Sequence, residues 1–222
     1  MALKVGVILS GSGVFDGSEI HEATLTLLSL SQRGAQVKIM APDIPQAKTV
    51  NHLIQEDTDE KRNVLVESAR IARGQIVPVT DVDPKTLDTV IMPGGYGAAL
   101  NNSDFATAGP DLKVDPGIDA LLKAVYQQGK PLGAMCIAPP ILAKVLSDLG
   151  VSGAKLTIGN DTQVAAAINA LGQTHVDCVA TSCVTDREHR VVTTPAYMLA
   201  QDLAELWQGI DCAVKELLAL CK

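Results

Sequence analysis

The stretch PLGAMCIAPP, residues 131–140, decides the fold class of this chain. A short apolar run leads to Cys136, and Pro139 and Pro140 then suit the first turn of a helix, where a missing backbone N–H costs least. A buried strand that passes directly into a helix is the building unit of parallel α/β sheets. We therefore place Cys136 at a strand-to-helix turn, outside the carboxyl end of a strand, where open parallel sheets bind their ligands.

The same alternation of strand and helix extends to both sides of this stretch. The expected strands are residues 4–9, 36–40, 76–79, 89–92 and 131–136. The expected helices are residues 18–33, capped by Ser18, then 61–73, 118–128, 138–149, 161–171 and 199–220, the last broken near Gly209. Residues 177–184 and 190–194 are expected to form a late antiparallel hairpin, and the Gly- and Asn-rich residues 97–117 a long loop. The pattern predicts one α/β domain over residues 1–222, with a mostly parallel central sheet and helices on both faces.

The composition sets limits on the function. The 222 residues are 47% hydrophobic but only 3% aromatic, so the core is expected to be aliphatic. The net charge of −7 repels phosphate backbones and argues against nucleic-acid binding. No apolar run is long enough for a membrane span. The first 13 residues, MALKVGVILSGSG, lack the cleavage site of a signal peptide, and we expect a cytoplasmic protein.

The five cysteines give no sign of a metal site. They are Cys136, Cys178, Cys183, Cys212 and Cys221, an odd number with no CxxC pair and no histidine at zinc spacing. In the expected reducing compartment they are predicted to be free thiols. We interpret the last four as structural or surface cysteines.

Cys136 is the candidate nucleophile. The small residues Gly133 and Ala134 before it, and a helix start after it, resemble a nucleophile elbow. A helix N-terminus stabilises a thiolate, so a lowered pKa is expected for Cys136. The alternative is a buried core cysteine, which is the common fate of a free cysteine, but the strand-to-helix junction favours the functional interpretation.

Two other segments are expected to meet Cys136 at the same edge of the sheet. Gly94 and Gly95 follow a strand directly and allow close approach of the backbone. The N–H groups of Gly95 and Ile137 are then candidates for an oxyanion hole. Glu19 and Glu22 share one side of the first helix turns, and one of them is predicted to hold and move a proton beside the thiol.

None of the four histidines is expected to take part in catalysis. His21 is predicted to point away from Glu19 and Glu22 by helical geometry, and His52, His175 and His189 are predicted to face solvent in loops or turns.

The three strand ends together resemble the ThiJ/PfpI superfamily. The segments are GSEIHE at 17–22, PGGYG at 93–97 and AMCIAP at 134–139. Longer segments, among them PGGYGAALNNSDFA at 93–106 and VVTTPAYMLAQ at 191–201, are similar to the ElbB glyoxalase group, also called isoprenoid-biosynthesis or sigma-cross-reacting proteins. The resemblance implies a flavodoxin-like three-layer sandwich related to class I glutamine amidotransferases, and a homodimer.

The resemblance also implies roles for individual residues. Cys136 matches the nucleophile of the superfamily and Glu22 its acidic partner. Gly95 and Ile137 match the two backbone donors, and Glu19 lies nearby. The chain departs from the superfamily in one respect. It lacks the histidines that the proteases, the amidotransferases and the other glyoxalases of the superfamily carry, and Gly159 stands where those glyoxalases have theirs.

These residues favour a glyoxalase that needs no cofactor and no metal. An aldehyde is already electrophilic, so a Cys–Glu pair is sufficient to convert a small dicarbonyl, glyoxal, to glycolate, whereas amide cleavage without an imidazole is doubtful. Two alternatives stay open. One is a redox sensor or interaction protein with incidental aldehyde or deglycase activity. The other is an amidotransferase-like subunit of a synthase.

Overall fold

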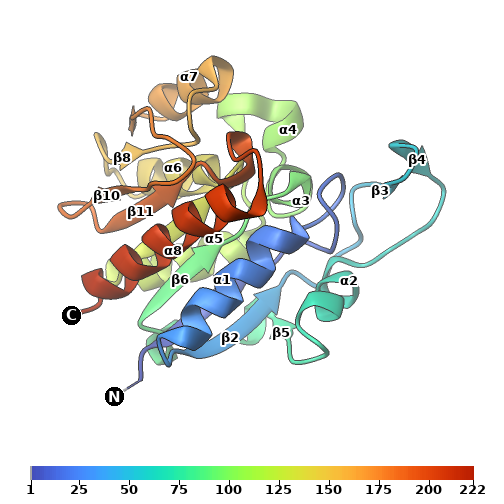
Figure 1. Ribbon diagram of the computed structural model, residues 1–222, viewed down its shortest axis with the longest axis horizontal. Helices are drawn as coiled ribbons and strands as arrows, with labels where there is room; N and C mark the ends of the chain where they lie inside the picture. Colours follow the sequence, from blue (N-terminus) through green and yellow to red (C-terminus); the bar gives the residue numbers. More distant parts are fainter. Residues whose placement is uncertain (1) are drawn as a thin grey trace.

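The centre of the protein is a seven-stranded sheet, seen in Figure 1 in a computed structural model that describes residues 2–222. Its strands are β1 (Lys4–Ile8), β2 (Gln36–Ala41), β5 (Val77–Pro78), β6 (Thr89–Met92), β7 (Leu132–Met135), β10 (Val184–Asp186) and β11 (Val191–Thr194). They lie in the order β10-β11-β7-β6-β1-β2-β5, and every pair is parallel except β10 with β11. The predicted mostly parallel sheet with a late antiparallel hairpin is confirmed.

The chain leaves β1 toward β2 and β5, then returns to place β6 on the other side of β1. This reversal is the topological switch point of the sheet, where open α/β folds bind ligands. The loops that follow β1, β6 and β7 all leave the sheet at its carboxyl edge. They carry Glu19, Gly94 and Cys136, so the topology brings together three segments that are far apart in the sequence.

Helices cover both faces of the sheet. They are α1 (Ile20–Gln32), α2 (Val64–Ile71), α3 (Tyr96–Leu100), α4 (Phe105–Ala108), α5 (Pro116–Gln127), α6 (Pro139–Asp148), α7 (Thr162–Ala170) and α8 (Leu203–Leu220). The long helices α1 and α8 lie side by side on one face, in front of the sheet in Figure 1, while α5 and α6 cover the other. Two guanidinium nitrogens of Arg33 bind the carboxylate of Asp211 at 2.7 and 3.0 Å and join the end of α1 to α8.

Strands of the sheet contribute side chains to two aliphatic cores, one on each face, because successive side chains point to opposite faces. In β1, Val5 and Val7 pack beneath α1 and α8, whereas Ile8 packs with Leu122 of α5 on the opposite face. All four of these side chains are fully buried. A strand that is buried on both faces is apolar at nearly every position, and this is why β1 could be identified from its sequence.

Several predicted element boundaries are wrong, each for a local reason. The cap of α1 is Glu19, whose carboxylate accepts from the backbone N–H of Glu22, while the buried Ser18 hydroxyl accepts from Ser10. The last helix begins at Leu203 and is not broken at Gly209. A Cβ at Gly209 would overlap the Ala180 carbonyl oxygen, so glycine serves here for close packing.

The remaining differences concern short elements. The expected loop 97–117 contains α3, which starts at Tyr96, together with α4 and a 3-10 turn (Gly109–Asp111). The expected strand 76–79 shortens to β5. The first strand of the late hairpin was expected at 177–184, but β10 overlaps it only at Val184 and extends into the expected turn. None of the described helices is both apolar and long enough to cross a bilayer.

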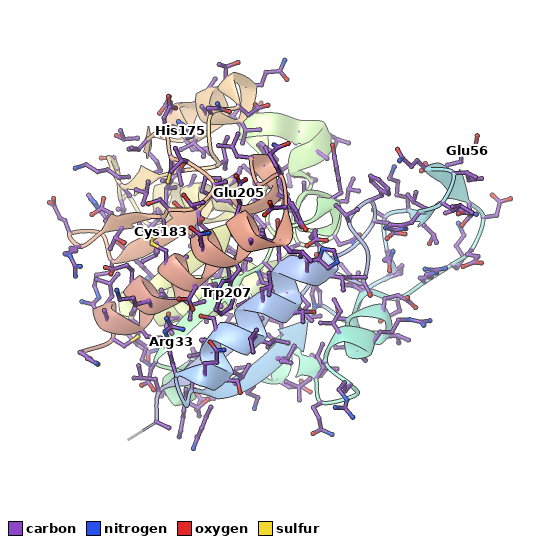
Figure 2. The ribbon with its side chains drawn as sticks, in the orientation of Figure 1. Arg33, Glu56, His175, Cys183, Glu205 and Trp207 are labelled. Atoms are coloured by element: carbon purple, nitrogen blue, oxygen red, sulfur yellow. A yellow bond between two sulfur atoms is a disulfide. The ribbon has the colours of Figure 1, made fainter. Side chains whose placement is uncertain are left out.

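Two small sheets were not predicted. Strands β8 (Lys155–Leu156) and β9 (Thr174–His175) pair in parallel beside α7. Strands β3 (Thr49–Asn51) and β4 (Glu56–Thr58) form an antiparallel hairpin that projects from the body of the molecule, with Glu56 near its far end (Figures 1 and 2). We call residues 42–63 the arm.

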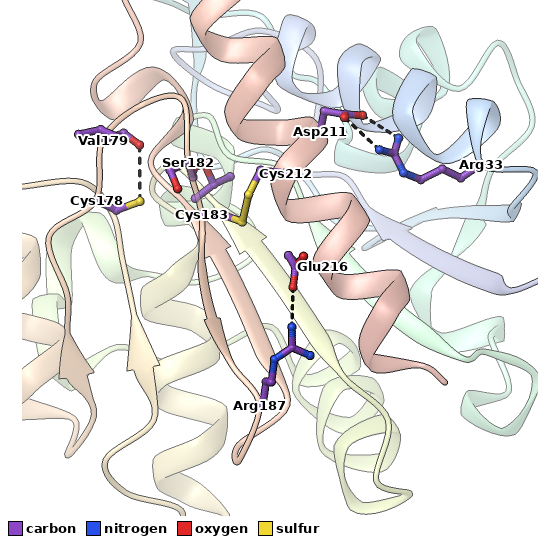
Figure 3. The surroundings of a disulfide bond; sticks show 10 residues. Arg33, Cys178, Val179, Ser182, Cys183, Arg187, Asp211, Cys212 and Glu216 are labelled. Atoms are coloured by element: carbon purple, nitrogen blue, oxygen red, sulfur yellow. Dashed lines mark hydrogen bonds and ion pairs between the residues drawn. A yellow bond between two sulfur atoms is a disulfide. The ribbon is translucent and has the colours of Figure 1, made fainter.

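The prediction that all five cysteines are free thiols is also wrong. Cys183, just before β10, and Cys212 in α8 form a disulfide with a Cα–Cα distance of 6.0 Å (Figure 3). Spacing alone did not reveal it, because the two residues become neighbours only when α8 packs against β10. Cys136, Cys178 and Cys221 are free.

Candidate active site

Cys136 occupies a strained turn between β7 and α6. Its φ is +59°, a left-handed conformation that a non-glycine residue rarely adopts, and its N–H donates to the carbonyl oxygen of Thr194 in β11 at 3.1 Å. Only 8% of its surface is exposed. Strain of this kind concentrates at functional sites, where the surrounding structure holds one side chain in place. The turn has the geometry of a nucleophile elbow.

Glu22 brings a carboxyl group against Cys136 from the first turn of α1. It is fully buried, and its Oε2 and the sulfur of Cys136 flank the same point at Gly94. Its Oε2 accepts from the N–H of Gly94 at 2.8 Å, and its Oε1 accepts from the N–H of Tyr197 at 3.2 Å. Both carboxyl oxygens are therefore fixed by backbone donors, and the side chain has little freedom to turn away from the sulfur.

Glu19 fixes the start of the helix that carries Glu22. Its carboxylate accepts from the backbone N–H of Glu22 at 2.7 Å, and its own N–H donates to the carbonyl oxygen of Gly94 at 2.9 Å. One glycine thus meets α1 twice, once through its N–H and once through its C=O. This contact sets the distance between α1 and the turn after β6.

The glycine pair after β6 has no room for side chains. A Cβ on Gly94 would lie 2.9 Å from the sulfur of Cys136 and 2.8 Å from Oε2 of Glu22. A Cβ on Gly95, whose φ is +96°, would overlap the backbone of Glu19. The absence of side chains lets the backbone N–H of Gly95 reach the sulfur, which also receives the N–H of Ile137.

The electrostatics of the pair differ from the expectation. Burial, reinforced by the charge of Glu19, raises the pKa of Glu22 from 4.5 to about 7. Burial and the charge of Glu22 raise the pKa of Cys136 well above its usual value of 9.0, although the N–H groups of Gly95 and Ile137 act in the opposite direction. The predicted lowering of the thiol pKa is therefore wrong, because desolvation and a like charge outweigh the backbone donors.

Above about pH 7 a pair of this kind holds one proton between the two groups. Thiol with carboxylate, and thiolate with carboxylic acid, carry the same net charge, so moving the proton from one to the other brings no new charge into the buried site. The arrangement is suited to a thiol that loses its proton to Glu22 at the moment when it attacks an electrophile.

The structure brings together all six residues that the sequence analysis selected: Cys136, Glu22, Glu19, Gly94, Gly95 and Ile137. Two neighbours were missed, Tyr197 and His21. The prediction that His21 points away from Glu19 is wrong, because its Nδ1 lies 3.9 Å from Oε1 of Glu19. Tyr197 donates its backbone N–H to Glu22, and its hydroxyl lies 2.9 Å from Nδ1 of His21. No sequence pattern shows that the backbone N–H of a residue will contact the site. The only pointer to Tyr197 was its place in segment 191–201, which resembles the family.

No histidine bonds Cys136 or Glu22 in the described part of the chain. A Cβ at Gly159 would lie 2.9 Å from the Leu199 side chain, and φ there is +102°, so a side chain at this position would be strained. His175 was expected to face solvent, but the structure buries its side chain. Its side chain is 5% exposed, burial lowers its pKa, and its Nε2 accepts from the N–H of Ile158 at 3.4 Å. Among residues 2–222, no three His, Cys, Asp or Glu side chains converge as metal ligands.

Comparison with known proteins identifies the family of the chain. A family model described as DJ-1/PfpI family matches residues 13–205. The human protein "Glutamine amidotransferase-like class 1 domain-containing protein 3, mitochondrial" is 42% identical over 99% of this chain and 84% of its own length. The rat "ES1 protein homolog, mitochondrial" is 41% identical over 98% and 84%, respectively.

Solved structures share the fold over the whole chain. An isoprenoid biosynthesis protein with an amidotransferase-like domain from Ehrlichia chaffeensis superposes with a TM-score of 0.92 at 36% identity, covering 100% of both chains. The glyoxalase III of Candida albicans superposes with a TM-score of 0.64 at 16% identity, covering 98% of this chain and 97% of its own, which is a likeness of fold. The predicted superfamily and its flavodoxin-like fold are confirmed.

The expected cytoplasmic location is contradicted. The human and rat relatives are both mitochondrial by name, as is the ES1 protein of Danio rerio, which is 30% identical over 98% of this chain and 86% of its own length. The expectation relied on the absence of a secretory signal, and that test says nothing about import into an organelle.

Proposed function

Because this chain belongs to the DJ-1/PfpI family, we propose that it is a glyoxalase without cofactors, which converts glyoxal and water to glycolate. One observation carries the proposal. A thiol and a carboxyl group lie beside each other in a buried site that also directs two backbone N–H groups at the sulfur, and no histidine bonds either group within residues 2–222.

The first step is addition of the thiol to one aldehyde carbon. The proton of Cys136 passes to the Glu22 carboxylate as the S–C bond forms, and the carbonyl oxygen becomes an oxyanion. The N–H groups of Gly95 and Ile137 then stabilise this charge. Glu22 returns the proton to the oxyanion, which gives a neutral hemithioacetal and a carboxylate.

The second step moves a proton between the two carbons. The Glu22 carboxylate removes the hydrogen from the carbon that carries sulfur, which leaves an enediolate. It then delivers that proton to the neighbouring carbon, while the hydroxyl proton on the first carbon's oxygen passes to the oxygen of the neighbouring carbon, and the product is a thioester of glycolate. Water attacks the thioester, the C–S bond breaks, and glycolate and the thiol of Cys136 are released. The sum is one glyoxal and one water giving one glycolic acid.

The electrostatics favour this chemistry over the alternatives. An aldehyde is electrophilic enough for a thiol whose proton leaves during the attack, whereas an amide needs a strong acid to protonate its leaving nitrogen. A redox sensor needs an accessible thiolate. Cys136 is buried and the pKa of its thiol is raised, which argues against that alternative. The 8% exposure of Cys136 also favours a substrate of two or three carbons.

The proposal is tested with purified protein, glyoxal and an assay for glycolate. Cys136→Ala is expected to abolish turnover, because no other described thiol lies at this turn. Glu22→Gln removes the proton acceptor and is expected to lower kcat by at least 100-fold. Cys178→Ser is the matched control, since Cys178 is a free cysteine outside the site, and should keep full activity. Full activity in Cys136→Ala would end the proposal.

We also expect a homodimer, on the resemblance noted from the sequence. Light scattering at micromolar concentration should give twice the mass of 23.3 kDa. A mass that stays at one chain over the whole accessible concentration range would reject this expectation.

A further inference from the structure

Three side chains lie together at the rim of the site, outside the Cys136–Glu22 pair. Nδ1 of His21 is 2.9 Å from the hydroxyl of Tyr197 and 3.9 Å from Oε1 of Glu19. The His21 side chain is 54% exposed, while that of Glu19 is only 11% exposed. The cluster therefore runs from solvent toward the buried carboxyl groups at the start of α1.

Tyr197 connects this rim to the reacting groups. Its backbone N–H donates to Oε1 of Glu22 at 3.2 Å. It follows β11, whose Thr194 carbonyl accepts the N–H of Cys136. Burial raises the pKa of Tyr197, and the charges of Glu19 and Glu22 raise it further, so the phenol keeps its proton at neutral pH.

The neighbours of His21 decide which way its hydrogen bond runs. A carboxylate beside Nδ1 favours a proton on that nitrogen, since the opposite tautomer would place a lone pair toward a negative charge. Nδ1–H then donates to the oxygen of the Tyr197 hydroxyl. The phenolic proton is left free to donate to another group.

The proposed reaction leaves one oxygen without a donor. Gly95 and Ile137 serve the oxygen on the carbon attacked by sulfur. When the proton leaves that carbon, negative charge develops on the oxygen of the neighbouring carbon, and none of the six selected residues donates to it. A fixed donor at that point lowers the barrier of the proton transfer.

We propose that the hydroxyl of Tyr197, oriented by His21, donates to the second oxygen of a 1,2-dicarbonyl bound to Cys136. Tyr197 is then a catalytic residue, while His21 is a positioning residue that acts through it. This inference rests on the proposed glyoxalase function and extends it, because it makes the second oxygen the feature that distinguishes a substrate from a simple aldehyde.

The test compares variants in the glyoxal assay with a binding measurement that does not involve the second oxygen. Tyr197→Phe should lower kcat/KM for glyoxal at least tenfold, mostly in kcat, since the charge on the oxygen develops in the transition state. The inhibition constant of propanal, which forms a hemithioacetal but has no second oxygen, should stay within twofold of the wild type. The rate of alkylation of Cys136 by iodoacetamide should also be unchanged.

Substitutions at His21 separate positioning from mere structural support. His21→Leu should lower kcat about as much as Tyr197→Phe, whereas His21→Asn places an amide N–H near the position of Nδ1 and should restore activity to within about threefold. The double variant Tyr197→Phe with His21→Leu should be no worse than Tyr197→Phe alone, because both changes remove the same interaction.

Three outcomes overturn the inference. Equal turnover of glyoxal by Tyr197→Phe and wild type rejects the inference and leaves the proposed function standing. A Tyr197→Phe variant that loses propanal binding and glyoxal turnover by the same factor assigns Tyr197 a structural role. A wild-type protein that makes no glycolate rejects the proposed function and this inference together.

Discussion

At the scale of single residues, the site depends on a carboxyl group that is expensive to ionise. Glu22 is fully buried, and its pKa is raised to about 7, so protonated and ionised forms coexist at neutral pH. A carboxyl group of ordinary pKa would be a weak proton acceptor for a thiol. Burial therefore raises the basicity of Glu22 toward the range that general acid–base catalysis at neutral pH requires.

The pH dependence of turnover should follow this carboxyl group. Below pH 7 Glu22 is protonated and cannot accept the thiol proton, so kcat/KM for glyoxal is expected to rise with pH, with a midpoint near 7. Glu19→Gln keeps an acceptor oxygen at the helix cap but removes a charge that raises the pKa of Glu22, and it should move the midpoint to lower pH. Initial rates from pH 5 to 9 measure both. A flat profile between pH 6 and 8 would contradict this role of Glu22.

The lack of a side chain at Gly94 is equally important. Gly94→Ala places a Cβ within 2.9 Å of the Cys136 sulfur and of Oε2 of Glu22, so the two groups must separate. We expect at least a 100-fold loss of turnover and a loss of about 1–3 kcal/mol in the free energy of unfolding. Glycolate assays and urea unfolding measure these effects.

A second glycine provides the control for that experiment. A Cβ at Gly34 meets no atom within 4 Å, but φ there is +68°. Gly34→Ala should therefore lower the free energy of unfolding by about 1 kcal/mol through backbone strain alone and leave turnover unchanged. If both variants lose activity in proportion to their stability, the steric argument for Gly94 does not hold.

The residues of the pair could be predicted from the sequence, but their ionisation could not. The strand-to-helix junction identified Cys136. Helical spacing left Glu19 and Glu22 as candidates for its partner, and the family resemblance selected Glu22. The sign of the thiol pKa was missed because the sequence shows the nearby helix start but not the depth of burial, and burial dominates here. Tyr197 was missed because its N–H reaches Glu22 across 175 residues of sequence.

At the scale of elements, prediction succeeded where one local signal decided the structure. The strands β1, β6 and β7 are short apolar runs that end in glycine or cysteine turns, and the structure places them at nearly the predicted positions. Short elements defined by distant partners were missed. The strands β8 and β9 exist only because they pair with each other, and β3 and β4 only because the arm folds back on itself.

Gly209 shows why a glycine in a helix is ambiguous. Glycine lowers helix propensity by about 1 kcal/mol, which suggested a break in α8. The helix continues because its neighbours come within contact distance of the glycine backbone, and this packing outweighs the propensity. Sequence reasoning cannot distinguish a break from a close contact without knowing what lies opposite.

The disulfide is a prediction at this same scale, because it joins α8 to the segment before β10. Cys212→Ser should lower the free energy of unfolding by about 3–4 kcal/mol under oxidising conditions, as expected for a crosslink across a separation of 29 residues. Urea unfolding with and without a dithiol reductant measures the effect. The wild type with reductant should match the variant, and Cys178→Ser should match the untreated wild type. Equal stability of oxidised wild type and Cys212→Ser would show that the bond contributes nothing.

At the scale of the whole molecule, the buried carboxyl group affects the stability of the entire sheet. Glu22 lies where α1, the turn after β6 and the elbow after β7 meet, so its ionisation opposes the packing of all three. In the unfolded chain its pKa returns to about 4.5. Between 4.5 and 7 the folded protein therefore binds more protons than the unfolded chain, and this group's contribution to stability falls as the pH rises.

This sign leads to a prediction about global unfolding. We subtract the free energy of unfolding of Glu22→Gln from that of the wild type. This difference should fall by about 3 kcal/mol between pH 5 and 8, because Glu22, with a pKa of about 7 in the folded protein and 4.5 in the unfolded chain, loses its proton over this range and the glutamine does not titrate. The comparison cancels the titration of all other groups and any constant cost of the amide. Urea unfolding at each pH provides the values. If the Glu22→Gln difference does not change between pH 5 and 8, the carboxyl group is not held at a raised pKa, and the proton transfer on which the proposed chemistry depends is absent.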